Sequence, residues 1–225
     1  MADFDRVLIL ETAGPVGQAA LAADGRVIAE ARLGAERRRA SDLAVVVERM
    51  LGQAGWKPVT LTAVIVALGP GSYTGLRVGL ASAKALAYAV GSKFFGVESF
   101  AAIALRTSGE ISVIGDALKG ELFRRDYRRI GHGLDPMGAL EVVSGANWSR
   151  GLRPRQRVTG PATALWEGKL PPGVEFVAPD ERTPRPVDLL TIAQTCPWAV
   201  TTDMWTAEPY YLRGSSAEEK AAGRS

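Results

Sequence analysis

Short apolar runs separated by turn residues organise the first part of the chain. Residues 6–12, 17–22 and 26–33 are such runs, each of strand length and each bounded by glycine, proline or aspartate. Asp24-Gly25 stands between the second and third runs, and this dipeptide is a strong signal for a tight hairpin. The pattern therefore predicts three consecutive strands joined by short turns.

Two long helices with a strand between them are predicted next. Residues 42–54 repeat apolar side chains at helical spacing, with Ser41 or Asp42 as the N-cap and Gly55 as the stop signal. Residues 61–68 are apolar and rich in β-branched side chains, which indicates a buried strand. Residues 75–90 are free of proline and rich in Ala and Leu, which indicates a second helix that ends at Gly91.

The order of these elements predicts the fold class. Three strands followed by helix, strand and helix form a ribonuclease-H-like or actin-like half, which a strand at 93–97 and a helix at 100–106 complete. Strands at 111–117 and 121–130 then begin a similar pattern again. We therefore predict an α/β protein of the actin-like ATPase (ASKHA, ribonuclease-H-like) fold with two related subdomains, 1–106 and 107–213. Further strands are expected at 140–143 and 174–177, a helix at 187–196, and a disordered tail at 214–225.

Composition narrows the class of protein. The chain is 47% hydrophobic and 23% charged, which is typical of soluble globular proteins. Cys196 is its one cysteine, and no apolar run reaches the length of a membrane span, so we expect a cytoplasmic protein without membrane contact. A net charge of +3 permits a nucleic-acid partner but does not require one.

The loop that joins the strand at 61–68 to the helix at 75–90 is the main candidate for a ligand-binding site. Gly69-Pro-Gly-Ser-Tyr-Thr-Gly75 leads from a strand into a helix, where free backbone N–H groups and the helix dipole favour an anion. The spacing excludes a P-loop, because no Gly-Lys-Ser/Thr follows. A phosphate contact and a purely structural turn both remain open. The candidate nucleotide-binding residues are Glu11, Thr12, Gly69, Gly71, Ser72, Thr74, Gly75 and Asp116.

The two long helices are more apolar than a single core face requires. Ala44 and Val45 widen the stripe of the first helix, and small residues let another helix approach the second. A central core position explains this pattern, and so does an association surface for another chain. The candidate interface residues are Ala44, Val45, Val47, Met50, Arg77, Leu80, Ala81, Ala83, Lys84 and Ala87.

Familiar catalytic constellations are not visible in the sequence. His132 is the one histidine, and neither an H-x-x-x-H nor a C-x-x-C motif occurs, so we assign no catalytic residue and no metal ligand. Two arginine runs, 36–39 and 124–129, suit either an RNA contact or a solvated face.

Four motifs, taken together, resemble the TsaB (YeaZ) family. They are LILETA in the first strand, GPGSYTGLRVGLASAKALA from Gly69, IGDALKGELF around Asp116, and EPYYLR near the end. They lie in the family's order and span about residues 11–213, and the motif from Gly69 is the specific one.

The resemblance implies a function. A family member is a non-catalytic subunit that supports the TsaD transferase in making N6-threonylcarbamoyladenosine (t6A37) in tRNA. It pairs with TsaD through the two helices beside the signature strand, is bound by the TsaE ATPase, and forms a homodimer when alone. No cofactor is required by the subunit alone; ATP or ADP with Mg would lie at the partner interface, and tRNA is met through the complex.

The sequence also departs from the family pattern. Glu11 replaces the usual Asp, Ala40-Ser41 replaces a frequent His-Ser, and residues 145–185 show no match. Two rival functions follow from the residues. One is an actin-like small-molecule kinase or phosphatase that uses Glu11, Asp116 and the Gly69 loop. The other is an actin-like metallopeptidase, against which the lack of histidines argues.

Overall fold

The computed structural model describes residues 4–33 and 39–212 and contains two mixed β-sheets. The first sheet has the order β12-β5-β4-β1-β2-β3. β1 to β3 are antiparallel neighbours, whereas β4 and β5 run parallel to β1, and β12 is an antiparallel edge strand. Its strands are β1 (Arg6–Glu11), β2 (Gln18–Ala23), β3 (Arg26–Arg32), β4 (Ala63–Gly69), β5 (Lys93–Glu98) and β12 (Val200–Thr201).

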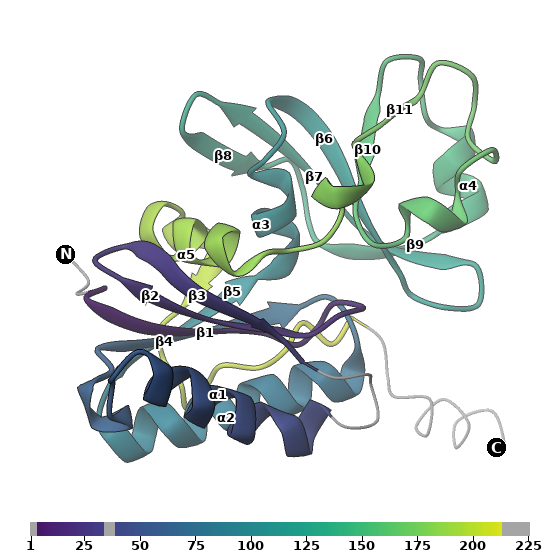
Figure 1. The fold of residues 1–225 in the computed structure, drawn as a ribbon. Helices are drawn as coiled ribbons and strands as arrows, with labels where there is room; N and C mark the ends of the chain where they lie inside the picture. Colours follow the sequence, from purple (N-terminus) through teal and green to yellow (C-terminus); the bar gives the residue numbers. More distant parts are fainter. Residues whose placement is uncertain (1–3, 34–38, 213–225) are drawn as a thin grey trace, which may run out of the picture.

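Helices cover both faces of the first sheet (Figure 1). α1 (Arg39–Gln53) and α2 (Tyr73–Val90) lie on one face, and α3 (Ser99–Ala104) and α5 (Pro186–Thr195) lie on the other. The period of two in β1 divides its side chains between these layers: Leu8 packs with the α1 and α2 core, and Val7 packs with the α3 and α5 core. A buried central strand therefore needs apolar residues at every position, as β4 has.

The second sheet repeats the order of the first. β8, β7, β6, β10 and β11 are arranged as β3, β2, β1, β4 and β5 are, with antiparallel pairs on one side and parallel pairs on the other. This repetition confirms the predicted actin-like class. The strands are β6 (Gly109–Asp116), β7 (Glu121–Ile130), β8 (Gly133–Pro136), β9 (Glu141–Ser144), which also pairs with β7, β10 (Arg157–Thr159) and β11 (Glu175–Phe176).

The chain returns to the first sheet after the second is complete. α3 contacts β4 of the first sheet and β6 of the second, and α5 packs on the first sheet, so both helices lie where the sheets meet (Figure 1). β12 then pairs with β5. The division into subdomains 1–106 and 107–213 stays a prediction, and α5 and β12 are packed on the first sheet.

Short elements complete the described chain. α4 (Gly145–Arg150) packs beside β9 on the second sheet. Single 3₁₀ turns occur at Pro58–Thr60, Thr163–Leu165, Pro179–Glu181 and Pro197–Ala199. Within the ranges described, no helix has the length and apolar character needed to cross a membrane.

Helix boundaries differ from the predictions at their N-terminal ends. α1 begins at Arg39, so neither Ser41 nor Asp42 is its N-cap as predicted. α2 begins at Tyr73, and the Ser72 side chain accepts a hydrogen bond from the Gly75 N–H, which makes Ser72 the cap. β8 was not predicted from the pattern. Residues 36–38 of the first arginine run and the predicted tail 214–225 lie outside the described residues.

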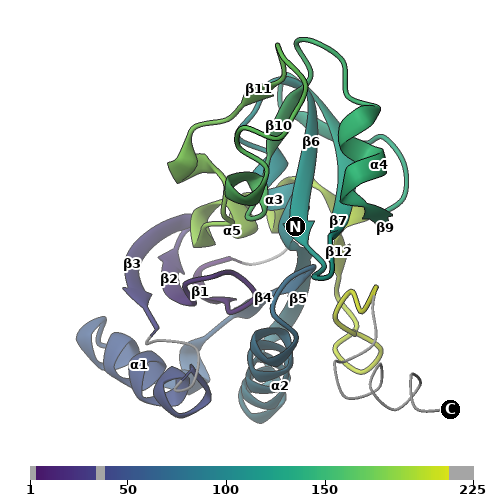
Figure 2. The ribbon, with the colours of Figure 1, turned by 90° about the vertical axis from the view of Figure 1, so that its right-hand side faces the viewer.

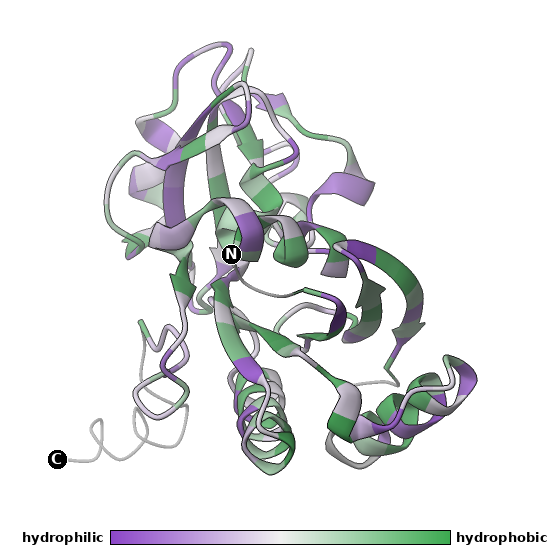
Figure 3. Ribbon diagram, turned by 90° about the vertical axis from the view of Figure 1, so that its left-hand side faces the viewer, coloured by the Kyte–Doolittle hydropathy of each residue, from purple (hydrophilic) through white to green (hydrophobic). Residues whose placement is uncertain are grey.

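Hydropathy follows this layering (Figure 3). α1 carries hydrophilic and hydrophobic stripes, since one of its faces is in water, and hydrophobic colour runs along the strands behind it. Leu43 and Met50 of α1 are buried against the sheet, whereas Ala44 and Val45 are exposed. The first helix therefore presents a partly apolar outer surface.

Candidate functional site

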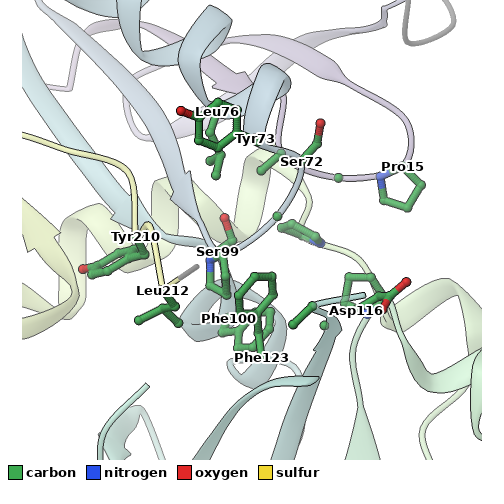
Figure 4. Close-up of a pocket in the computed structure, with 18 of the residues that line it drawn as sticks. Pro15, Ser72, Tyr73, Leu76, Ser99, Phe100, Asp116, Phe123, Tyr210 and Leu212 are labelled. Carbon is green, nitrogen blue, oxygen red and sulfur yellow. The ribbon is translucent and has the colours of Figure 1, made fainter. Parts of the chain in front are cut away.

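A cleft of about 630 Å³ lies where the two sheets meet. It is bordered by the glycine loop before α2, the end of β6, helix α3 and the last described segment of the chain (Figure 4). Aromatic side chains form much of its wall: Tyr73, Phe100, Phe123, Tyr210 and Tyr211. This is the position at which the actin-like arrangement brings the ends of corresponding strands together.

The glycine loop packs against the chain that follows β1. Gly71 has no room for a side chain, because a Cβ there would lie 2.6 Å from the Ala13 carbonyl oxygen. The Ser72 N–H donates a hydrogen bond of 2.9 Å to the same oxygen, and the Gly69 N–H donates one of 3.1 Å to Ser99 Oγ. Several N–H groups of the loop are therefore already bonded within the protein.

Glu11 and Thr12 are buried and point into the protein. Glu11 Oε1 accepts hydrogen bonds from the N–H groups of Ala13 and Gly14, at 2.9 and 3.0 Å. Thr12 Oγ1 donates a hydrogen bond of 2.7 Å to the Gly75 carbonyl oxygen. Glu11 thus fixes the turn after β1, and Thr12 ties that turn to the start of α2.

Asp116 is exposed and lies on the cleft wall at the end of β6 (Figure 4). Its Oδ1 accepts a hydrogen bond of 2.8 Å from the Leu118 N–H, which stabilises the turn into β7. Asp116 therefore occupies in the second half the place that Glu11 occupies in the first, but only Asp116 faces the cleft.

The structure brings three of the eight predicted nucleotide-binding residues to the cleft. Gly71, Ser72 and Asp116 line it, whereas Glu11, Thr12, Gly69, Thr74 and Gly75 are not among the lining residues. Asp116 is the one charged side chain among the described residues that line the cleft. A polyphosphate bound there would face a carboxylate and no lysine or arginine, so these residues do not fit a nucleotide held by this chain alone. Nucleotide binding by this chain stays a prediction.

The last described segment of the chain forms a wall of the cleft, although it was not predicted as part of the site. The Tyr210 N–H donates a hydrogen bond of 2.9 Å to the Leu68 carbonyl oxygen, directly before the glycine loop. Tyr211 packs against Tyr73 with tilted rings whose centroids are 5.0 Å apart, and its hydroxyl accepts a hydrogen bond from Arg77 Nε. The EPYYLR motif was the signal that could have placed this segment beside the loop, since both belong to the resemblance.

A buried polar cluster joins the two sheets beside the cleft. Glu98, at the end of β5, forms an ion pair of 2.5 Å with Arg125 Nη1 and accepts a short hydrogen bond from the Tyr127 hydroxyl. Burial raises the pKa of Glu98, against the lowering effect of Tyr127 and Arg125. Burial and the Glu98 carboxylate raise the pKa of Tyr127 well above its usual value, so the phenol remains protonated and donates.

The arginines of β7 are engaged with protein groups. Arg124 pairs with Asp126 and Glu141, Arg125 with Glu98, and Arg128 with Glu110. The guanidinium of Arg129 donates to the carbonyl oxygens of Leu105 and Gly131. Of the two functions left open for this run, RNA contact therefore has little support.

The predicted interface residues divide into exposed and buried groups. Four of them are buried in the core beneath the first sheet, so their prediction as surface residues was wrong: Met50, Leu80, Ala83 and Ala87. Val47 and Lys84 are half-buried, and Ala44, Val45, Arg77 and Ala81 are exposed. α1 and α2 lie side by side below the sheet (Figure 2), which leaves a narrower helical surface than the sequence predicted.

No three histidine, cysteine, aspartate or glutamate side chains gather as a metal site within residues 4–33 and 39–212.

Comparison with known proteins identifies the family. Residues 33–159 match the model of the family described as TsaD: tRNA N6-adenosine threonylcarbamoyltransferase. The chain belongs to the TsaD family. The match includes the glycine loop, α2 and most of the second sheet.

Individual relatives extend the similarity to the ends of the chain. Two relatives are named tRNA threonylcarbamoyladenosine biosynthesis protein TsaB, and each is 28% identical to this chain. The Bacillus subtilis protein aligns over 95% of this chain and 96% of its own length. The Escherichia coli protein aligns over 97% of this chain and 99% of its own length. A Mycobacterium tuberculosis protein is 40% identical over 102 residues, which are 45% of this chain and 46% of that protein. The chain thus spans about half the length of the Mycobacterium bovis and Mycobacterium tuberculosis relatives it matches.

A solved structure of another protein has the same fold. YeaZ from Pseudomonas aeruginosa superposes with a TM-score of 0.76 at 23% identity, over 92% of this chain and 100% of that one. The arrangement of two sheets joined at a cleft is therefore one that a known protein adopts.

Proposed function

We propose that this chain is a non-catalytic subunit of the bacterial machinery that makes N6-threonylcarbamoyladenosine in tRNA, and that it pairs with a TsaD-type transferase. The full-length similarity to two proteins named TsaB carries the proposal. The site agrees with it, because the cleft is walled largely by aromatic and apolar side chains, and the described residues that line it include no lysine or arginine for a phosphate. A non-catalytic subunit requires a stable fold and a surface that binds the transferase, and it does not require an active site.

The outer surface of α1 and α2 is the proposed contact with the transferase. Ala44 and Val45 on α1 and Ala81 on α2 are exposed small or apolar residues, and Val45 is 62% exposed. Exposed apolar side chains on neighbouring helices favour burial against another helix pair. We include in the proposal a homodimer through this surface in the absence of the transferase, a TsaE-like ATPase that binds the pair, and a cytoplasmic location.

Charge substitutions on this surface test the proposal. Val45→Glu and Ala81→Glu place a carboxylate at exposed positions, so each variant should fold and yet lose the heterodimer peak when mixed with the transferase of the same genome. Ile130→Glu is the matched control, because Ile130 is 70% exposed on β7 of the second sheet. Light scattering on a sizing column reports the masses. Unchanged pairing by both helix variants would contradict the assignment of this surface.

Reconstitution tests the role itself. A mixture of transferase, ATPase and this chain, supplied with tRNA, ATP and an activated threonylcarbamoyl donor, should form threonylcarbamoyladenosine in the tRNA. Omission of this chain should abolish the product. The kinase or phosphatase alternative is not favoured by the similarities found, and nucleotide turnover by the chain alone would be the result that revives it.

A further inference from the structure

A basic segment without acidic residues crosses the outer part of the second sheet. Between Glu141 and Glu167 the chain contains no aspartate or glutamate, and it contains four arginines: Arg150, Arg153, Arg155 and Arg157. The segment runs from α4 through the loop into β10. Its positive charge is therefore not balanced along the chain.

Nor is the charge balanced in space. None of these four arginines forms an ion pair with an acid in the described part of the chain. Arg150 donates to the Ala146 carbonyl and the Asn147 side-chain oxygen, and Arg157 donates to the Ser108 carbonyl, all uncharged groups. Arg153 and Arg155 are exposed. This differs from β7, where Arg124, Arg125 and Arg128 each have a carboxylate partner.

The loop holds these arginines in a defined backbone conformation. Arg155 has a φ of +68°, in the left-handed region that residues other than glycine seldom adopt. Its N–H donates a hydrogen bond of 2.6 Å to the Gly173 carbonyl oxygen, which fixes the loop to the chain before β11. Such conformations persist where the surrounding structure enforces them, and they are frequent at binding sites.

A small polar pocket of about 210 Å³ opens beside this segment. Gly151, Leu152 and Gln156 of the basic segment line it, together with Trp148 of α4 and Ser112 of β6. Trp148 and Ser112 are buried residues, 9% and 8% exposed, and neither the Trp148 Nε1–H nor the Ser112 hydroxyl has a hydrogen-bond partner among the described residues. Two buried donors without a partner, on residues that line one pocket, favour a ligand that carries acceptor oxygens.

The other charged groups of the pocket neutralise each other. Arg124 and Asp126 also line it, and the Arg124 guanidinium is bonded to both carboxylate oxygens of Asp126 and to Glu141. The pocket therefore offers hydrogen-bond donors without a strong charge of its own, and the arginines of the neighbouring segment supply the attraction for an anion.

We propose that Arg150, Arg153, Arg155 and Arg157 contact the phosphates of an RNA, and that the Trp148 and Ser112 pocket receives an acceptor oxygen of the same RNA. Arginines without a carboxylate partner are the usual contacts to a nucleic-acid backbone. The choice of RNA among polyanions rests on the proposed function in tRNA modification. This surface lies around α4 and β10, far from α1 and α2 (Figure 1). The proposed RNA surface and the proposed transferase surface are therefore on opposite sides of the folded molecule.

The test is a fluorescence-anisotropy titration of a labelled tRNA anticodon stem-loop with the full chain. Arg153→Gln/Arg155→Gln should weaken binding at least tenfold at about 100 mM salt and reduce the slope of log K against log salt by about 2, roughly 1 for each lost phosphate contact. Arg26→Gln/Arg32→Gln, which removes equal charge from β3, is the matched control and should stay within twofold of the wild type.

A spectroscopic measurement isolates the pocket. The indole N–H resonance of Trp148 should move saturably when the stem-loop is added, whereas that of the exposed Trp205 should not. Ser112→Ala should weaken RNA binding several-fold, because it removes one buried donor without adding bulk. RNA binding by the wild type that is undetectable at low salt, or an equal loss in the β3 control, would overturn the proposal.

Two further results distinguish the proposed RNA site from a general polyanion surface and from a failure of the proposed function. An equal loss of affinity for heparin, with an unmoved Trp148 resonance in RNA, would show a general polyanion surface and overturn the RNA site. Pairing of Arg153→Gln/Arg155→Gln with the transferase is measured on the same samples. Normal pairing with lost RNA affinity supports the inference; normal pairing with unchanged RNA affinity refutes it and leaves the proposed function intact. Failure of the wild type itself to pair counts against the proposed function instead.

Discussion

Thr12 Oγ1 and the carbonyl oxygen of Gly75 are joined by a buried hydrogen bond of 2.7 Å, although the residues are 63 positions apart in sequence. The bond links the turn after β1 to the first turn of α2, and it passes Gly79 so closely that a Cβ on Gly79 would overlap the Thr12 hydroxyl. The small residues of α2 therefore serve contact with its own sheet as well as its outer surface.

Gly79→Ala should destabilise the protein for this reason. Adding a methyl group where Thr12 already lies forces the helix away from β1, and overpacking of this kind costs about 1–3 kcal/mol. Gly52→Ala is the control, because Gly52 is exposed in α1 and has nothing within 4 Å of its Cβ position. It should stabilise the protein by about 0.5–1 kcal/mol, since alanine is the better helix former. Urea unfolding followed by circular dichroism measures both, and equal behaviour of the two variants would contradict the packing argument.

Thr12→Val tests the hydrogen bond separately from the packing. Valine keeps the shape of threonine but removes the donor, which leaves the Gly75 carbonyl oxygen without that bond in the interior. The loss should be about 1–3 kcal/mol in the free energy of unfolding. Thr12→Ser keeps the hydroxyl and should restore most of the hydrogen-bond contribution, although it creates a small void. A valine variant as stable as the wild type would show that the bond contributes nothing.

The Glu98 cluster predicts a pH dependence. Because burial raises the folded-state pKa of Glu98 above its ordinary value of 4.5, its contribution to stability is fully present below that value and is lost as the pH rises through the folded-state pKa. Tyr127→Phe removes a hydrogen bond that lowers this pKa, so the pKa of Glu98 should rise further. Carbon-13 NMR of the carboxyl group gives the value in both proteins, and a decrease in the variant would contradict the sign.

A buried ion pair where the sheets meet should contribute more than its exposed neighbour. Arg106 and Asp188 form a pair of 3.2 Å with both side chains 7% exposed, and burial lowers the pKa of Arg106 although Asp188 opposes it. Asp188→Asn leaves a buried guanidinium without its charge partner and should cost about 3–5 kcal/mol. Arg185→Gln removes the half-exposed partner of the same carboxylate and should cost about 1 kcal/mol or less. Thermal unfolding of the two variants provides the comparison, in which similar losses would be the contrary result.

Local signals were sufficient for the order of elements from β1 to α3 and hence for the fold class, whereas α4, β10 and β12 were not predicted. Asp24-Gly25 lies at the hairpin between β2 and β3, and the β-branched run before Gly69 is the central strand β4. Each depends on residues close in sequence, so a chain pattern can reveal it. β8 was missed because it has four residues and a glycine start, which leaves little periodicity to detect.

The site was harder to predict, because its geometry depends on distant contacts. Glu11 looked like a ligand at a strand end, but it turns back onto the N–H groups of Ala13 and Gly14. Leu80 looked like an outer residue, yet it is 7% exposed in the core. Glu98 was not predicted as a site residue, because its partners Arg125 and Tyr127 lie on another sheet. Whether such a side chain points into the core or outward depends on the elements that pack against it. Those elements are distant in sequence, so a local pattern does not reveal the direction.

The pairing of β12 with β5 has a consequence for how the chain is made. All strands of the second sheet lie within residues 109–176, so that sheet can close as soon as those residues leave the ribosome. The first sheet begins earlier in synthesis but waits for α5 and for Val200–Thr201 before its edge and its covering layer are complete. The half that is translated first is therefore the half that finishes folding last, and its apolar face towards α5 must be protected in the meantime.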